Sequence, residues 1–196
     1  APDQTRATRD RPAAGARMTA PMQARVRRAE PGEAAAVAAL AARTFPLACP
    51  PTLPREHVAA FVATQLSEAE FDRHLADPAH RVLVVDGPGG PVGYALVLHG
   101  AHDEGPEALR GAPSADLSKL YVDPDHHGGG VARALLDAVR ADAAGLPVWL
   151  GVNADNARAK RFYAKSGFVT AGVREFTVGG TTFVDDVLVL DDAVGA

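Results

Sequence analysis

Apolar and polar residues follow two different periods along this chain, and the period indicates the type of each element. Ala34, Val37, Leu40 and Ala41 lie on one face of a helix drawn over residues 31–45, which is typical of an amphipathic helix. Short apolar or alternating runs between Gly and Pro residues are instead typical of strands. This reasoning predicts helices at 31–45, 55–66, 67–77, 130–144 and 156–167, and strands at 24–29, 81–86, 91–102, 115–123, 147–152, 168–178 and 181–190.

Turn and capping residues mark the boundaries between these elements. GPGG at 87–90 and GG at 179–180 each lie between two strand-like runs, so both predict hairpins. Ser67 predicts an N-cap, with Glu70 as the second half of a capping box, and Gly167 predicts the residue that ends the last helix. The combination of hairpins with crossover helices predicts an α/β domain with a mixed sheet rather than a purely parallel one.

Composition limits the class of protein. The chain has 196 residues, 47% hydrophobic and 22% charged, as expected of one soluble globular domain. A formal net charge of −4 argues against a general nucleic-acid-binding protein. Cys49 is the only cysteine, so we expect no disulfide within the chain and no cysteine-based metal site.

The ends of the chain and its longest apolar runs bear on location. Residues 1–23 contain four arginines, three prolines and almost no large apolar residue, which predicts a disordered N-terminal extension before a domain at 24–192. No apolar run approaches the roughly 20 residues that span a bilayer, and the start of the chain lacks the apolar core of a signal peptide. We therefore expect a cytoplasmic protein with no membrane partner.

A glycine-rich loop connects the strand at 115–123 to the helix at 130–144. Its sequence, DPDHHGGG, places Gly128, Gly129 and Gly130 at the start of the helix. The first amides of a helix have no partner within it and lie at the positive end of its dipole, and glycines let an anion approach the backbone closely. The loop is therefore a candidate phosphate site, although an ordinary flexible connection has the same composition and three glycines alone do not separate the two.

Two common phosphate-binding motifs do not match this loop. GxxxxGK[ST] requires Lys-Ser or Lys-Thr, but the helix opens with Val131, Ala132 and Arg133. GxGxxG requires the first turn of a parallel βαβ unit, whereas this loop comes late in the chain. The sequence therefore argues against ATP and a nicotinamide dinucleotide as ligands.

The surrounding sequence resembles a known family. The segment LSKLYVDPDHHGGGVARALLDAV, residues 117–139, resembles the acetyl-CoA-binding segment of the GNAT N-acetyltransferase superfamily. That family has a [Q/R]-x-x-G-x-[G/A] signature, and His127, Gly130 and Ala132 stand at its three defined positions. VNADNARAKRFYAKSGF, residues 152–168, resembles the family's second motif. The resemblance implies a single GNAT-type α/β domain whose mixed, mostly antiparallel twisted sheet has about seven strands, is splayed between strands four and five, and carries helices on both faces.

The same resemblance implies acetyl-CoA as the co-substrate and no metal. The backbone amides of the loop and the first helical turn are expected to bind its pyrophosphate, with the Arg133 side chain adding charge. These residues are His127, Gly128, Gly129, Gly130, Val131, Ala132 and Arg133. The pantetheine arm is expected to pair, like an added strand, with the backbone of Leu120, Tyr121 and Val122, and one of these amides is expected to polarise the thioester carbonyl.

Three further residues of these motifs have two interpretations each. His127 replaces the usual Gln or Arg, and we expect its side chain to be a solvated loop histidine rather than a ligand. Asn156 is expected to bind the cofactor, to cap its helix, or both. Lys160 either reaches the adenosine phosphates or belongs to a solvated basic face.

Two residues are candidates for proton transfer. Tyr163 falls at the family's general-acid position, where it would protonate the leaving thiolate; the alternative is core packing with Phe162. Asp116 stands where many members carry Glu, and we expect it to act as the base through a water, an ordinary strand-edge aspartate being the alternative. His99, His102 and Asp103 are secondary candidates for the base.

The predicted function is acetyl transfer from acetyl-CoA to a primary amine of a small acceptor. Residues 44–85 together with LSKLYV resemble bacterial polyamine-type acetyltransferases, and acidic residues in this region and in the loop at 102–116 agree with a cationic acceptor. The alternatives are acetylation of a protein N-terminus or lysine, and a domain that senses acyl-CoA without turnover. A monomer and a homodimer are both compatible with the sequence.

Overall fold

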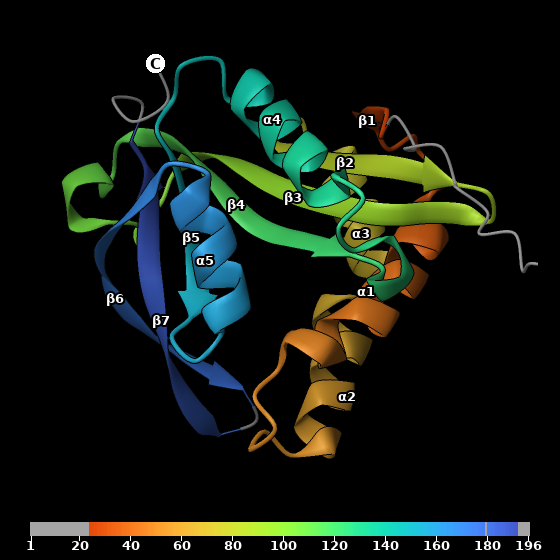
Figure 1. Ribbon diagram of the computed structural model, residues 1–196, viewed down its shortest axis with the longest axis horizontal. Coiled ribbons are helices and arrows are strands. Elements are labelled where there is room, and N and C mark those ends of the chain that lie inside the picture. Colours follow the sequence, from red (N-terminus) through yellow and green to blue (C-terminus); the bar gives the residue numbers. More distant parts are fainter. Residues whose placement is uncertain (1–23, 179, 192–196) are drawn as a thin grey trace, which may run out of the picture.

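A twisted sheet runs through the part of the chain that the computed structural model describes, residues 24–178 and 180–191 (Figure 1). Its strands lie in the order β1-β2-β3-β4-β5-β7-β6, and the β4–β5 pair is parallel whereas all other neighbours are antiparallel. The mixed, mostly antiparallel sheet is therefore confirmed. The strands are β1 (Val26–Arg28), β2 (His80–Gly87), β3 (Gly90–Ala101), β4 (Pro113–Val122), β5 (Val148–Asn153), β6 (Phe168–Val178) and β7 (Thr181–Leu190).

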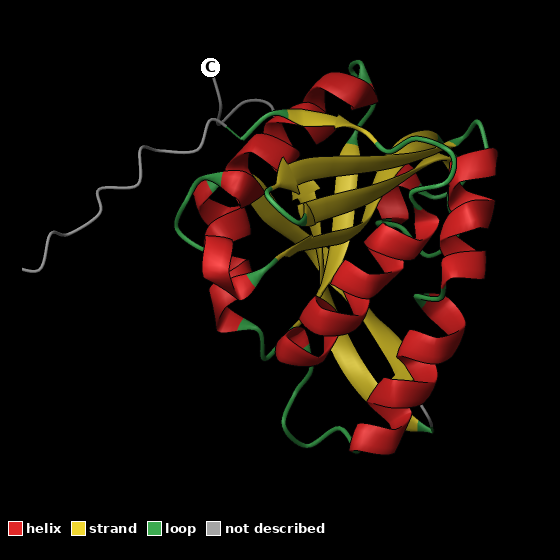
Figure 2. Ribbon diagram, turned by 90° about the vertical axis from the view of Figure 1, so that its right-hand side faces the viewer, coloured by secondary structure: helices red, strands yellow, loops and turns green. Residues whose placement is uncertain are grey.

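Helices cover both faces of the sheet, as expected (Figures 1 and 2). On one face, α4 and α5 pack against apolar residues of β2, β3, β4 and β5. On the other face, α1 and α3 pack against β2, β3 and β4, and α2 packs beside α1, where Phe61 stacks on Phe45. The helices are α1 (Ala34–Ala48), α2 (Arg55–Gln65), α3 (Glu68–Ala76), α4 (Val131–Ala143) and α5 (Ala157–Lys165). No helix within the described ranges is long and apolar enough to cross a membrane.

The sheet opens between β4 and β5. The two strands pair only at Ala115 with Val148 and at Asp116 with Trp149, while β4 continues to Val122 alongside β3. Beyond Asp116 the strands diverge, and the edge of β4 that faces β5 has no strand partner in the described part of the chain. The expected splay is confirmed.

A β-bulge in β4 decides which side chains face which helices. Leu96 pairs with Lys119 and Val97 with Leu117, so Ser118 is the extra residue. An extra residue reverses the alternation of side chains beyond it. As a result the side chain of Asp116, before the bulge, points to the same face of the sheet as those of Lys119 and Tyr121, after the bulge. This is the side covered by α1, α2 and α3.

The element order predicted from sequence is confirmed, and the differences lie at the ends of elements. Helix α1 continues through Pro46 to Ala48, three residues past the predicted end, since a proline near the end of a helix removes only one hydrogen bond of the last turn. Two 3₁₀ turns, Glu107–Leu109 and Pro124–His126, were not predicted. The proposed extension at 1–23 lies outside the described residues, as does the last residue of the 24–192 domain.

The predicted caps are confirmed in part. The Ser67 hydroxyl accepts a hydrogen bond from the Glu70 amide at 3.3 Å, and Gly167 has a φ of 87°. The Glu70 carboxylate pairs with Arg73 instead of completing the capping box. Arg73, one turn further along the helix, competes successfully with the backbone amide of Ser67 for the Glu70 carboxylate.

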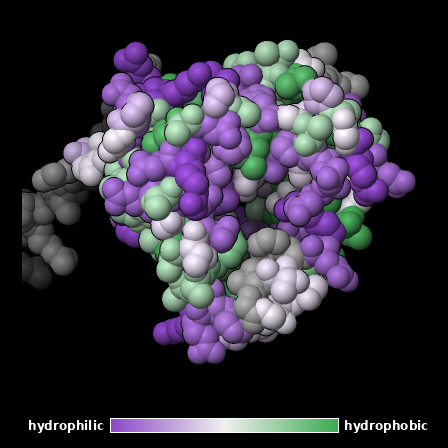
Figure 3. Space-filling model, turned by 180° about the vertical axis from the view of Figure 1, so that it is seen from behind, coloured by the Kyte–Doolittle hydropathy of each residue, from purple (hydrophilic) through white to green (hydrophobic). Residues whose placement is uncertain are grey.

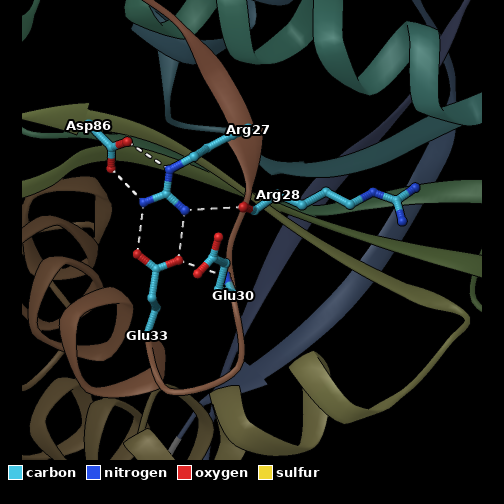
Figure 4. Close-up of polar contacts among 5 residues, drawn as sticks. All are labelled: Arg27, Arg28, Glu30, Glu33 and Asp86. Atoms are coloured by element: carbon cyan, nitrogen blue, oxygen red, sulfur yellow. Dashed lines mark hydrogen bonds and ion pairs between the residues drawn. The ribbon is translucent and has the colours of Figure 1, made fainter.

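Arg27 holds the short edge strand β1 to its neighbours (Figure 4). Its guanidinium donates to both carboxylate oxygens of Asp86 at 2.7 and 2.8 Å and to both oxygens of Glu33 at 2.7 and 2.8 Å. One Glu33 oxygen also accepts from the Glu30 amide at 2.6 Å. These hydrogen bonds, the Arg27 bonds first, lower the pKa of Glu33 to about 2. The cluster joins β1, the end of β2 and the start of α1.

Replacing Arg27 by Gln should therefore lower the free energy of unfolding by roughly 1–2 kcal/mol, the range expected of a charge network rather than an isolated surface pair. Arg25→Gln, at an exposed neighbouring position, is the matched control and should have almost no effect. Because the pKa of Glu33 is lowered in the folded state, its contribution is complete above pH 4.5 and is lost as the pH falls toward 2. Urea melts at several pH values between 4.5 and 2 measure the free energy of unfolding of Arg27→Gln and Arg25→Gln. The difference between the two variants should shrink as the pH falls. A difference that stays constant would contradict this account.

Candidate active site

The glycine loop has the geometry of an anion-binding turn. Gly128 and Gly130 have φ values of 79° and 82°, in the left-handed region that favours glycine. Gly130 is the N-cap of α4, and its carbonyl accepts the first helical hydrogen bond from Ala134 at 2.9 Å. An added Cβ at Gly128 or Gly130 would meet no atom of the described chain within 4 Å, so the space in front of both residues is open.

Five backbone amides of this turn are available to a ligand. The amides of Gly128, Gly130, Val131, Ala132 and Arg133 have no hydrogen-bond acceptor within the described ranges. Convergent free amides at the positive end of a helix favour phosphate oxygens. The expectation for residues 127–133 needs one correction. The His127 amide donates to Pro124 and the Gly129 amide to His126, because the 3₁₀ turn before the helix uses them.

The His127 side chain is exposed, as expected of a loop histidine, but it has a partner within the protein. Its Nε2 lies 2.9 Å from the Val122 carbonyl oxygen. With the ring donating, this hydrogen bond ties the loop to the end of β4. One of the backbone groups expected to pair with pantetheine, the Val122 carbonyl, is therefore already engaged.

The exposed edge of β4 forms one side of the splay. Leu120, Tyr121 and Val122 are all half-buried, with Leu120 and Val122 packed on the α4 side and Tyr121 on the α1 side. An extended ligand that enters between β4 and β5 meets free backbone groups of this edge, as in strand addition. The contact of these residues with the pantetheine arm stays a prediction.

Asp116 lies where β4 and β5 begin to diverge. Burial raises its pKa to about 6, while the positive charges of Arg174, His102 and Lys119 oppose the rise and Glu104 adds to it. A carboxylate with a pKa closer to neutrality is a stronger base than an exposed one, while it is still largely ionised at pH 7. Asp116 is therefore well suited to accept a proton at the head of the splay.

The secondary candidates for the base are separated by the structure. His99 Nε2 lies 2.7 Å from Asp142 on α4, on the opposite side of the sheet from Asp116. His102 lies 3.1 Å from the Leu98 carbonyl and contacts Trp149 edge-on, and its charge acts on Asp116. Asp103 is exposed in the loop after β3. His102 therefore lies near Asp116, whereas His99 is engaged elsewhere.

Tyr163 is both a core residue and a neighbour of the splay. Only 8% of it is exposed, and its ring packs edge-on against Phe162 and Phe168 with centroids 5.2 and 5.4 Å apart. Burial raises its pKa above the usual value. Its phenol also acts electrostatically on that of Tyr121 across the splay. The core-packing interpretation is thus met, and the position also suits a proton donor.

Three other sequence candidates have partners of their own. The Asn156 side chain caps α5 by accepting from the Ala159 amide at 3.1 Å. Lys160 pairs with Asp186 at 2.6 Å and donates to the Ala154 carbonyl at 3.2 Å, so its ammonium is held at the protein rather than free on a basic face. Arg133 pairs with Asp137 one turn along α4, and both are exposed.

Sequence reasoning did not identify two charged residues on the Asp116 side of the sheet. Burial lowers the pKa of Lys119, and Asp116 opposes the shift. Arg174 of β6 lies over the Trp149 ring, with its Cζ 5.8 Å from the ring centroid. Regular strand alternation places Lys119 on the opposite face from Asp116. The bulge at Ser118, which the sequence does not predict, brings both side chains to the same face.

A hollow of about 510 Å³ lies on this side of the sheet, between the loop after β3 and strand β6. Its lining includes Glu104, Glu107, Arg110, Arg174 and Glu175. In Figure 3, which shows the molecule from behind, the surface is mostly hydrophilic and a recess opens near the middle of the view. No three His, Cys, Asp or Glu side chains of the described ranges converge as metal ligands.

Comparison with solved structures identifies the fold. A PaiA N-acetyltransferase from Thermoplasma acidophilum, solved with coenzyme A, superposes with a TM-score of 0.67 at 16% identity, over 86% of this chain and 98% of that one. A GCN5-related N-acetyltransferase from Rhodopseudomonas palustris gives 0.64 at 24% identity, over 85% and 94%.

Sequence comparison identifies the family. The chain is 46% identical over 156 residues to an uncharacterised N-acetyltransferase of Mycobacterium tuberculosis, which covers 78% of this chain and 94% of that protein. A mycothiol acetyltransferase of Clavibacter sepedonicus is 43% identical over 77 residues, only 21% of its length. The family described as acetyltransferase (GNAT) domain matches residues 49–189. With a family match over most of its length and a relative of this identity and coverage, the chain belongs to the GNAT family and is an acetyltransferase.

Proposed function

We propose that this acetyltransferase moves an acetyl group from acetyl-CoA to the primary amine of a small acceptor, by direct attack in a ternary complex. The observation that carries the proposal is the position of Asp116, a carboxylate with a raised pKa at the point where β4 and β5 separate. A base is needed there because an amine with a pKa near 10 is an ammonium at neutral pH and must lose a proton before it attacks.

The residues around the splay have complementary roles in this proposal. Acetyl-CoA supplies an acetyl thioester. The free amides of Gly128, Gly130 and the first turn of α4 bind its pyrophosphate, and the edge of β4 receives its extended arm. Asp116 takes the ammonium proton, directly or through water. Tyr163, whose phenol is protonated at neutral pH, gives its proton to the leaving thiolate and recovers one from the nitrogen, which loses its second proton as the amide forms.

The size and shape of the site favour a small acceptor. Helix α1 and strand β4 approach closely on the Asp116 side, where Phe45 stacks on Phe61 and contacts Tyr121 edge-on. The hollow of about 510 Å³ matches the volume of small-molecule sites. Polyamine-like amines are among the acceptors to be tested, since the loop after β3 is acidic.

Thiol release from acetyl-CoA, measured against a panel of amines, tests the proposal directly. Amine-dependent release with formation of the acetylated amine supports it. Release only with peptides would support acetylation of a protein N-terminus or lysine, and tight acetyl-CoA binding without release would support a sensor; both would overturn the proposal.

The glycine loop is tested by a pair of substitutions at Gly130. Asn tolerates the left-handed conformation better than most residues and is the uncharged counterpart of Asp. Gly130→Asp places a negative charge beside the pyrophosphate and should lose at least about tenfold more coenzyme A affinity than Gly130→Asn, the scale of one charge interaction in a partly desolvated site. Calorimetry with coenzyme A measures both. Gly111→Asp, at another left-handed glycine far from this loop, controls for strain; equal affinities of the two Gly130 variants would place the phosphates elsewhere.

Replacing Asp116 by Asn should remove a titration from the pH profile. In the wild type, kcat/KM should rise as the pH passes through about 6, because the carboxylate must be ionised to accept a proton. The Asp116→Asn variant should lose the rise of kcat/KM near pH 6, and its kcat should fall by about 10²–10⁴-fold. Asp103→Asn, which changes an exposed carboxylate of the nearby loop, should keep the rise and the wild-type kcat. An Asp116→Asn variant that retains the rise near pH 6 would exclude Asp116 as the base.

Tyr163→Phe removes only the phenolic oxygen and keeps the ring that packs against Phe162 and Phe168. We expect kcat to fall by about 10²–10⁴-fold while coenzyme A affinity stays nearly constant. Tyr94→Phe is the matched control, because the Tyr94 hydroxyl is also buried but has no hydrogen-bond partner in the described ranges, so its removal should leave activity unchanged. Lost affinity with intact kcat would make Tyr163 a binding residue, and full activity would assign the proton to water.

A further inference from the structure

The guanidinium of Arg174 has fewer partners than its burial requires. Its side chain is 26% exposed, yet its Nε is buried and has no hydrogen-bond acceptor in the described ranges. Nη2 lies 3.5 Å from Asp185 and Nη1 lies 3.7 Å from Glu104, distances at or beyond the limit of a hydrogen bond. Arg27, which is 34% exposed, instead has four bonds of 2.7–2.8 Å to carboxylates. Arg174 is therefore a partly buried cation whose guanidinium has N–H groups free to donate hydrogen bonds to a ligand.

The guanidinium of Arg174 packs closely on strand β5. A Cβ at Gly151 of β5 would come within 2.4 Å of its Nη2 and 2.7 Å of its Cζ, so the absence of a side chain at Gly151 leaves room for the guanidinium in its present position. The ring of Trp149, two residues earlier on the same side of β5, lies beneath the guanidinium. Arg174 is therefore placed on the wall of the hollow.

Arg174 and Asp116 present opposite charges on the same side of the sheet. Trp149, over which Arg174 lies, is the register partner of Asp116 on β4, and the charge of Arg174 acts on the Asp116 carboxylate. Asp185, the register partner of Arg174, lies on β7, between β6 and β5. An acceptor with an ammonium and a carboxylate matches this pair of charges.

Glu104 shows where such a carboxylate fits. Its side chain is 86% exposed, and its Oε2 approaches Nη1 of Arg174 from the loop after β3 without forming a hydrogen bond. An exposed pair at this distance contributes little and is readily displaced. The other carboxylates of the hollow, Glu107 and Glu175, are exposed, and water screens their attraction for a cationic acceptor.

We propose that Arg174 binds a carboxylate of the acceptor, so that the acceptor is an amino acid or another small amine that carries a carboxylate. This inference rests on the proposed function and narrows its acceptor class. The planar guanidinium suits a carboxylate because it donates two parallel hydrogen bonds. The ammonium of the acceptor then lies toward Asp116, which takes its proton, and the carboxylate lies toward Arg174. A polyamine satisfies Asp116 but brings no carboxylate to Arg174.

Matched acceptor pairs test the proposal. Each pair is an amino acid and the amine that lacks its carboxylate: glycine and methylamine, lysine and 1,5-diaminopentane, phenylalanine and phenethylamine. In the wild type, kcat/KM for at least one carboxylated member should exceed that of its partner by at least about tenfold, the scale of one charge-assisted hydrogen bond. Arg174→Gln should remove this preference and leave the decarboxylated amines nearly unchanged, and Arg174→Lys should restore part of it. Arg110→Gln, at an exposed arginine of the same hollow, should keep the preference.

Three results would overturn the proposal. A wild type that prefers the decarboxylated amines excludes a carboxylate site. If Arg174→Gln binds coenzyme A normally but kcat/KM falls equally for both acceptors of a pair, the role of Arg174 is structural. An Arg110→Gln variant with the same selective loss moves the site away from Arg174.

A binding measurement separates failure of this inference from failure of the proposed function. Calorimetry with coenzyme A present compares N-acetyl amino acids with the matched N-acetyl amines. If no amine is acetylated, the proposed function is wrong, but binding of the N-acetyl amino acids that is lost in Arg174→Gln still supports the carboxylate site. If neither kind of compound distinguishes the wild type from Arg174→Gln, the inference is wrong even where amines are acetylated.

Discussion

Two parallel strands that pair at Ala115 with Val148 and at Asp116 with Trp149 join the two halves of this sheet. Beyond that point both strands continue, and within the described ranges each leaves one edge of backbone donors and acceptors without a strand partner. Unpaired strand edges are normally avoided because they attract other chains. Here the open edges offer free backbone groups of the kind with which an extended ligand pairs. The glycine loop follows directly after the open part of β4, and Asp116 lies where the divergence begins.

The splay separates two candidate sites of different chemistry. At its α4 end, free amides and two left-handed glycines form a turn that suits anions without any side-chain charge. At its Asp116 end, the site is built from side chains, and burial raises the pKa of a carboxylate toward neutrality while neighbouring cations limit the rise. The first site binds by backbone geometry and the second is tuned by its electrostatic surroundings, so substitutions at the two ends should have separable effects on binding and on turnover.

Two residues near the splay combine exposure or charge effects with packing. Tyr163 lies in the apolar core between Phe162 and Phe168, yet its phenol is close enough to Tyr121 to raise the pKa of Tyr121. The His127 side chain is exposed, yet it fixes the loop to the Val122 carbonyl. Each of these side chains therefore has a structural role beside the splay, and the catalytic role of Tyr163 stays a prediction.

Much of this protein is determined locally. The order of helices and strands, the caps at Ser67 and Gly167, and the glycine turn follow from residues close together in the sequence, because helix periodicity, capping and left-handed glycines are local properties. The alignment of the two family motifs was equally visible in the sequence. The surroundings of Asp116 were not: its raised pKa depends on burial and on charges from its own strand, from β6 and from the loop after β3. The direction of Lys119 depends on a bulge that only the pairing with β3 defines, and the site of Arg174 depends on Gly151 and Trp149 in a different strand. Tertiary structure alone decided these features, because burial and charge are set by residues that only folding brings together.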